Sequence, residues 1–272
     1  MKFNKLSHPA CSRFTPNLAS TRKMGSEGTQ FILYLFSCLP LFYLAWNNRN
    51  YQLDDALIYL RYIRNFFNGS GLVYNPGDYF NGLTSPLYSY LVILAGLIID
   101  NLQFANILLA TICHASGLII FSKVFFAERS LIARCLFIIL AGTFPYFFLV
   151  YGMETPLFIL MTGLCLYCYQ IKKYFWLGIF SGLLILTRVE GGFLVAALLG
   201  GYLIKNRTLP SYRYFIIPLA LITGNLIFNK LYYGAYLPAT GSAKVWQGQS
   251  GLWGDGWLFL HVDYLFGWVF NS

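Results

Sequence analysis

The chain is poor in charged residues and poorest in acids. Only 11% of its 272 residues are Asp, Glu, Lys or Arg, whereas 57% are hydrophobic. A soluble domain carries about 25% charged residues, and the mean hydropathy here is +0.58. This composition excludes an ordinary soluble protein and indicates an integral membrane protein.

Several chemical signatures are also missing. The sequence contains no P-loop, no Rossmann glycine fingerprint and no HExxH or GxSxG motif, which argues against a soluble nucleotide or an ester as substrate. The polar loops contain no cysteine, so no disulfide framework is expected. The net charge of +9 does not indicate nucleic acid, because the basic residues lie in an N-terminal tail and in short connections between apolar runs. That distribution is typical of a topology signal.

Apolar runs follow one another along most of the chain. They predict an all-α, polytopic membrane helix bundle, although several are shorter than the ~20 residues that cross a bilayer core. The runs cover residues 31–46, 86–99, 102–126, 132–150, 156–171, 174–187, 192–204 and 214–229, with a further amphipathic stretch at 253–270. We divide the chain into a cytoplasmic basic tail (1–28), a transmembrane module (29–250) with an outer loop at 47–85, and a final aromatic, glycine-rich segment (251–272).

Charge placement predicts which connections share a side of the membrane. A cytoplasmic tail puts the loop after Trp46 outside, and the basic connections near Arg129 and Lys172 inside. These assignments conflict if every run spans. Either the run at 86–99 does not fully span, which is the explanation that we favour, or the rule fails at the loop near Arg129. Most acids then collect on the outer side, where a polar site would account for them: Asp54, Asp55, Asp78, Asp100, Glu154, Glu190, Asp255 and Asp263.

The most informative segment is the polar loop from Asp54 to Tyr88. Asp54 and Asp55 open an amphipathic helical pattern that ends at Asn68-Gly69, and turn signals follow. One carboxylate there would act as a general base. The alternative is that an aspartate only caps the helix. Either residue fits either role.

Three motifs carry a resemblance to a known family. Asp54-Asp55-Ala56-Leu57-Ile58-Tyr59-Leu60-Arg61-Tyr62, with Gly82-Leu83-Thr84-Ser85-Pro86-Leu87, resembles the first outer loop of multi-pass GT-C glycosyltransferases. The branch that it resembles includes mycobacterial terminal arabinofuranosyltransferases and related bacterial enzymes that use polyprenyl-phosphate sugars. Gly152-Met153-Glu154-Thr155-Pro156-Leu157-Phe158 and Thr187-Arg188-Val189-Glu190-Gly191 are similar to two later motifs of that branch. Such enzymes usually continue well past this point, so we expect a C-terminal part to be missing.

The resemblance implies transfer of a sugar from a polyprenyl-phosphate donor to a glycan or lipid acceptor, outside the bacterial cytoplasmic (inner) membrane. Asp54 or Asp55 would be the base. The donor phosphate would be bound by Arg61, Arg64, Arg188 and Lys244. The acceptor side would be shaped by Glu154, Glu190, Asn75, Thr84 and Ser85. No definite cofactor is implied, and a divalent cation held by the two glutamates is left open.

Plainer interpretations stay beside these. Arg188 and Glu190 would form a local ion pair, Glu154 would be a charge at a helix N-terminus before Pro156, and Arg64 would extend towards lipid headgroups. Two other functions are also open for the chain. The first is a non-catalytic role, as a truncated paralogue or membrane partner that binds lipid carrier. The second is that of a transporter or flippase.

Overall fold

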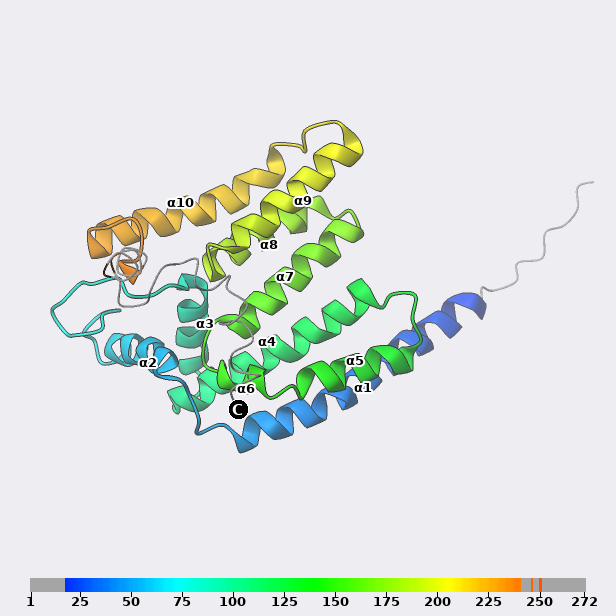
Figure 1. Ribbon diagram of the computed structural model, residues 1–272, viewed down its shortest axis with the longest axis horizontal. Coiled ribbons are helices and arrows are strands. Elements are labelled where there is room, and N and C mark those ends of the chain that lie inside the picture. The colour runs from blue at the N-terminus through cyan, green and yellow to red at the C-terminus, as the bar shows by residue number, and fades with distance from the viewer. Residues whose placement is uncertain (1–17, 241–245, 247–249, 251–272) are drawn as a thin grey trace, which may run out of the picture.

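A computed structural model describes residues 18–240, Trp246 and Ser250. Helices make up the ordered elements of this part of the chain, and no strand is found in it, which confirms the prediction of an all-α bundle (Figure 1). The helices are α1 (Leu18–Asn47), α2 (Asp54–Phe67), α3 (Pro86–Gly96), α4 (Leu102–Phe125), α5 (Leu131–Gly142), α6 (Tyr146–Leu149), α7 (Thr155–Gln170), α8 (Tyr174–Thr187), α9 (Gly191–Asn206) and α10 (Arg213–Tyr233). The predicted amphipathic stretch at 253–270 and Lys244 lie outside the described residues.

Three of these helices are long and apolar enough to cross a membrane: Glu27–Asn47 within α1, together with α4 and α10. The other apolar helices have 10–17 residues. The predicted run at 132–150 is divided, because α5 ends at Gly142 and Pro145 starts the short α6. A proline interrupts a helix because it lacks an N–H to donate.

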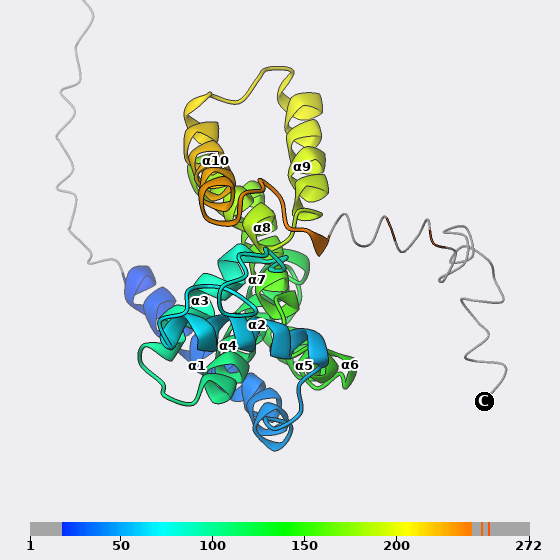
Figure 2. The same ribbon diagram turned by 90° about the vertical axis from the view of Figure 1, so that its left-hand side faces the viewer.

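Helix α3 is the helix on which the conflict in the charge pattern turns. It has 11 residues, and at about 1.5 Å per residue it is roughly 16 Å long, about half the thickness of a bilayer core. It stays at the end of the bundle where α2 lies, and α4 starts at that end and runs to the opposite one (Figures 1 and 2). This arrangement is compatible with a run at 86–99 that does not span, which stays a prediction.

One end of the bundle is mainly basic, and the other end holds most of the acids together with several arginines. The α4–α5, α7–α8 and α9–α10 connections meet at one end (Figure 1). They carry Lys123, Arg129, Arg134, Lys172, Lys173, Lys205, Arg207 and Arg213. The other end holds α2 and the starts of α4, α7 and α9, and with them Asp54, Asp55, Asp78, Asp100, Glu154 and Glu190. We call this second end the acidic end.

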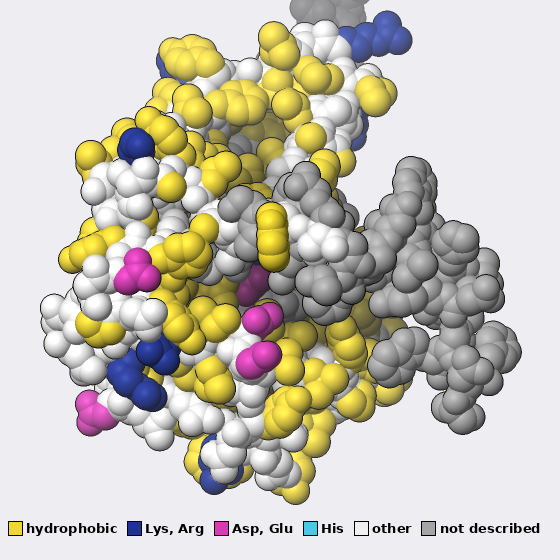
Figure 3. Space-filling model, turned by 60° about the vertical axis from the view of Figure 1, so that its left-hand side comes forward, with side chains coloured by type: hydrophobic (Ala, Val, Ile, Leu, Met, Phe, Trp, Pro, Cys, Tyr) yellow, Lys and Arg dark blue, Asp and Glu magenta, His cyan; other side chains and the backbone are white. Residues whose placement is uncertain are grey.

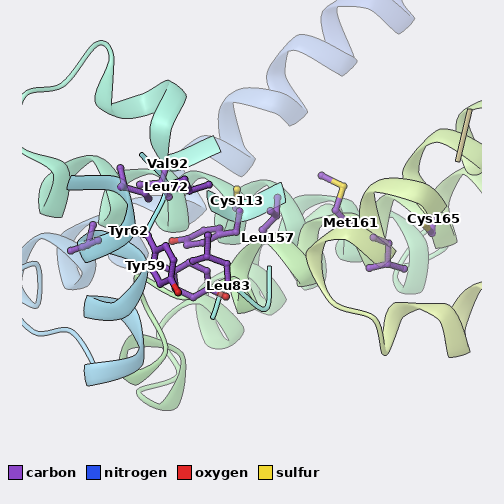
Figure 4. Close-up of a cluster of buried hydrophobic side chains, with 13 residues drawn as sticks. Tyr59, Tyr62, Leu72, Leu83, Val92, Cys113, Leu157, Met161 and Cys165 are labelled. Atoms are coloured by element: carbon purple, nitrogen blue, oxygen red, sulfur yellow. The ribbon is translucent and has the colours of Figure 1, made fainter. Parts of the chain in front are cut away.

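The core joins the acidic end to the helices beneath it. Its largest cluster of buried side chains extends from α2, through α3 and α4, to α7 and α8 (Figure 4). Close packing depends on small residues: a Cβ at Gly117 of α4 would lie 3.2 Å from the backbone nitrogen of Leu160 in α7. Glycines of this kind let helices approach closely in membrane proteins.

The loop after α2 is fixed by hydrogen bonds from two sides. Tyr62 of α2 donates its hydroxyl to the carbonyl of Phe80 at 2.8 Å. From α10, the hydroxyl of Tyr232 accepts the N–H of Leu72, and Tyr233 donates to the carbonyl of the same residue, each at 2.8 Å. The loop is thus a fixed surface at the acidic end.

Candidate active site

A buried carboxylate lies at the centre of the acidic end. The side chain of Glu154 is only 5% exposed. One of its oxygens accepts a hydrogen bond from Nη1 of Arg188 at 3.0 Å, and the other accepts one from the hydroxyl of Tyr59 at 3.2 Å. A buried charge is strongly destabilising unless it is paired and hydrogen-bonded. These two contacts are therefore what allow Glu154 to be buried as a carboxylate.

The hydroxyl of Tyr59 also connects Glu154 to the loop that precedes α3. It lies 2.8 Å from Oγ1 of Thr84. Since a phenol has one proton and Glu154 accepts it, Thr84 donates to Tyr59. Burial, and then the negative charge of Glu154, raises the pKa of Tyr59 above its usual value. Tyr59 is therefore a neutral donor. The hydroxyl of Thr84 donates to Tyr59, and the hydroxyl of Tyr59 donates to Glu154.

Arg188 joins the buried carboxylate to the surface. It ends α8 in an extended conformation, its side chain is 37% exposed, and its Nη2 lies 3.3 Å from Oε1 of Glu190. Partial burial acts to lower the pKa of Arg188, but the hydrogen bond to Glu190 and the charge of Glu154 raise it overall. The predicted local pair of Arg188 and Glu190 is present, and it continues inward to Glu154.

The backbone before Glu154 is held in place from α4. Gly152 has φ +87°, a conformation that side chains rarely adopt, and a Cβ there would lie 3.1 Å from the Cβ of Ala56 in α2. Its carbonyl accepts a hydrogen bond from Nδ2 of Asn106 at 3.0 Å, and Asn106 in turn accepts one from the hydroxyl of Tyr88 at 2.6 Å. The position of Glu154 is therefore set by the backbone contacts of Gly152. The side chain of Glu154 makes no capping hydrogen bond to α7.

The two aspartates lie on different sides of α2. Both are exposed in its first turn. Because a helix advances roughly 100° per residue, Asp55 shares a side with Tyr59, four residues later, whereas Asp54 shares one with Arg61. The interpretation that an aspartate caps the helix is wrong: Leu53 is at the N-cap, without a side-chain bond, and the carboxylate of Asp54 accepts the N–H of Asp55.

Arg61 and Arg64 are not brought together with Arg188. They point roughly 160° and 140° away from Tyr59 around the axis of α2. Arg61 donates to the carbonyl of Tyr74 at 2.9 Å and to Oδ1 of Asn75 at 3.0 Å, and its guanidinium lies 4.4 Å from the centre of the Tyr74 ring. Arg61 and Asn75 thus stabilise the loop. Figure 3 shows basic side chains in a group of their own beside the acidic ones.

The remaining candidates lie at the edge of this site or outside the described residues. Thr84 is exposed, and the next residue, Ser85, is buried where α3 begins. The hydroxyl of Ser85 has no hydrogen-bond partner among the described residues. In the same part of the chain, no three His, Cys, Asp or Glu side chains are grouped closely enough to hold a metal ion. Lys244 is not among the described residues.

An apolar groove leads towards Arg188 from the opposite end of the bundle. Its volume is about 290 Å³, and it lies where α9 and α10 stand apart above α8 (Figure 2). Its lining includes Leu177, Ile185, Val195, Leu198, Leu219 and Ile222. Ile185 is three residues before Arg188, so the backbone of Arg188 lies about one helical turn beyond this end of the groove.

Comparison with known proteins identifies two curated relatives of the same name. A terminal β-(1→2)-arabinofuranosyltransferase of Corynebacterium glutamicum is 26% identical over 92% of this chain and 41% of its own length. The protein of that name from Mycobacterium tuberculosis is 27% identical over 79% of this chain and 38% of its own length. The chain is related to glycosyltransferases. It spans about two fifths of these relatives. No family model and no solved structure matches it.

The motifs that resemble those of glycosyltransferases meet in the structure. The motif residues Glu154, Arg188 and Glu190 are joined in space, as are Thr84 and Glu154 through Tyr59. Sequence reasoning did not single out Tyr59 as a site residue. Its position four residues after Asp55 was the available signal, because that spacing puts both on one side of a helix.

Proposed function

We propose that this chain transfers a sugar from a polyprenyl-phosphate donor to a hydroxyl of a cell-envelope glycan or lipid acceptor, at the outer face of a bacterial cytoplasmic membrane. The observation that carries the proposal is a paired arginine at the acidic end, whose backbone lies about one helical turn beyond the last α8 residue that lines an apolar groove. A lipid phosphate needs these two environments next to each other.

The groove matches the chemistry of a lipid-linked donor. Its lining from Tyr174 to Ile185 along α8 corresponds to roughly 16 Å of helix at about 1.5 Å per residue. An isoprenoid chain in this groove would bring its phosphate to the half-exposed Arg188. Hydrogen bonds between a guanidinium and a phosphate are charge-assisted and strong. Glu154 and Glu190 hold Arg188 from either side and so fix the direction of its remaining donors.

Asp55 is the better placed base. It lies on the side of α2 that carries Tyr59, and Tyr59 is bonded to the carboxylate that holds Arg188. In the proposed reaction, the acceptor oxygen bonds to the anomeric carbon while the bond from that carbon to the phosphate oxygen breaks. The lipid phosphate leaves with the electron pair and is stabilised by Arg188. The acceptor proton goes to Asp55.

The experiment uses membrane vesicles that contain the whole chain and a radiolabelled polyprenyl-phosphate sugar. We expect Asp55→Asn to lower the rate of transfer by about 10²–10⁴, because it removes the base and keeps the shape of the side chain. Asp54→Asn is the matched control, and we expect it to retain most of the activity. Expression and membrane insertion are measured in parallel.

Other outcomes would contradict this assignment. Full activity in Asp55→Asn would exclude it as the base, and a selective loss in Asp54→Asn would move that role to the neighbouring residue. Absence of transfer by the unmutated chain would refute the proposal for this chain. Movement of the labelled lipid between leaflets without transfer would favour a flippase instead.

A further inference from the structure

A second polar feature of the acidic end lies on the other side of α2. Two adjoining hollows, of about 270 and 390 Å³, share Gln103 in the first turn of α4. The first is lined by Trp46, Arg49, Asn50, Asn101 and Phe104. The second is lined by Leu57, Leu60, Arg61, Arg64 and Asn65. We call the two together the arginine hollows.

The arginine hollows carry positive charge that no ion pair among the described residues neutralises. Within the described part of the chain, both salt bridges belong to Arg188. Arg49 donates only to a backbone carbonyl, that of Trp46, at 2.8 Å. The bonds of Arg61 to a carbonyl and an amide are likewise to neutral groups, and Arg64 is exposed. Three arginines thus line two hollows that share one amide side chain, a combination that suits an anion with several oxygens.

The position of the hollows indicates what brings that anion. Trp46 is in the last turn of α1 and Phe104 in the first turn of α4, and their rings meet edge to face at 6.0 Å. Both helices are candidate membrane spans, so these rings lie where the spans leave the apolar layer. Tryptophan is enriched at that level, beside the lipid headgroups. With the exposed Leu57, the two rings offer an apolar surface under a cationic rim.

We propose that the arginine hollows bind the phosphate headgroup of an anionic phospholipid of the surrounding bilayer. This inference goes beyond the proposed transfer reaction and does not depend on it. The site is separate from Arg188, because Arg61 and Arg64 face away from Tyr59 and because α1 packs on α4 and α5, whereas the groove lies between α8, α9 and α10. A bilayer phospholipid reaches the hollows directly from the lipid beside α1.

The test uses Trp46 as a reporter inside the site. The whole chain is placed in two sets of phosphatidylcholine nanodiscs. One set contains a small fraction of brominated phosphatidylglycerol, and the other contains the same fraction of brominated phosphatidylcholine. Bromine quenches nearby tryptophan, and the signal of Trp46 is the difference between the chain and its Trp46→Phe variant. We expect much stronger quenching by the anionic lipid. Each arginine removed should lower this preference about fivefold.

Variants locate the site. The double variant Arg49→Gln, Arg64→Gln should remove the preference for the anionic lipid. Lys230→Gln is a matched control, because Lys230 is a cation at the same end of the bundle, on α10. This variant should keep the preference. Arg64→Gln alone serves if the double variant does not fold. Equal quenching by the two lipids would overturn the proposal, and so would a preference that survives the arginine variants or disappears in Lys230→Gln. Displacement of the anionic lipid by added polyprenyl phosphate would assign the hollows to the donor and also overturn it.

Discussion

Replacement of Tyr59 by phenylalanine would test whether the buried network is as tightly coupled as its geometry indicates. The change removes one hydroxyl and keeps the ring, which packs edge to face on Tyr88 with ring centres 5.7 Å apart. The lost bond is the one that Glu154 accepts at 3.2 Å. Thr84 also loses its partner, but it is exposed and can bond to water. The effect therefore comes mainly from Glu154.

The magnitude follows from the kind of bond. A hydrogen bond to a charged group contributes about 1.5–3 kcal/mol, and Glu154 keeps its ion pair with Arg188. We therefore expect Tyr59→Phe to lower the free energy of unfolding by about 2 kcal/mol. In Glu154→Gln the same hydroxyl meets only a neutral amide, so a double-mutant cycle of the two changes should give a coupling of about 1–2 kcal/mol.

The assay is reversible unfolding in mixed detergent micelles, followed by circular dichroism. Tyr79→Phe is the control, because Tyr79 lies in the same loop with its side chain exposed, and it should change stability by less than about 0.5 kcal/mol. Additive effects of Tyr59→Phe and Glu154→Gln would refute the reasoning. They would mean that the two groups are neighbours without energetic coupling.

Two other predictions concern topology and packing. In a cysteine-free background, Ser70→Cys should react with an impermeant thiol reagent in cells whose outer barrier is opened. Glu128→Cys should react only after the cytoplasmic membrane is also permeabilised. The reverse pattern would show that the proposed orientation is inverted. Gly178→Ala should destabilise the protein by about 1–3 kcal/mol, because a Cβ there would collide with the carbonyl oxygen of Tyr214. Gly224→Ala, with nothing within 4 Å of the added Cβ, should leave the midpoint of thermal unfolding unchanged or slightly raised, and equal losses in both variants would argue against close packing of α8 on α10.

Much of the helical architecture could be predicted from the sequence. The run at 174–187 coincides with α8, and the helix that was expected to end at Asn68-Gly69 ends at Phe67. Hydropathy succeeds here because a backbone in lipid must satisfy its hydrogen bonds within the helix. The gathering of most acids at the end opposite the basic connections could also be predicted, since basic connections share one side. These properties depend on residues close together in the chain.

The arrangement of the site depends on residues that are far apart in the chain. Tyr59 and Glu154 are 95 positions apart, and Arg188 is 34 positions beyond Glu154. Helical spacing gives the side of α2 on which Tyr59 lies, but not which carboxylate it meets, because that depends on how α2 packs on α3 and α4. Helical spacing also puts Asp55, rather than Asp54, on the Tyr59 side of α2, and only the tertiary structure shows that Tyr59 meets the buried carboxylate of Glu154. The sequence by itself thus determined the membrane helices and the acidic end, and tertiary packing decided which of its polar groups act together.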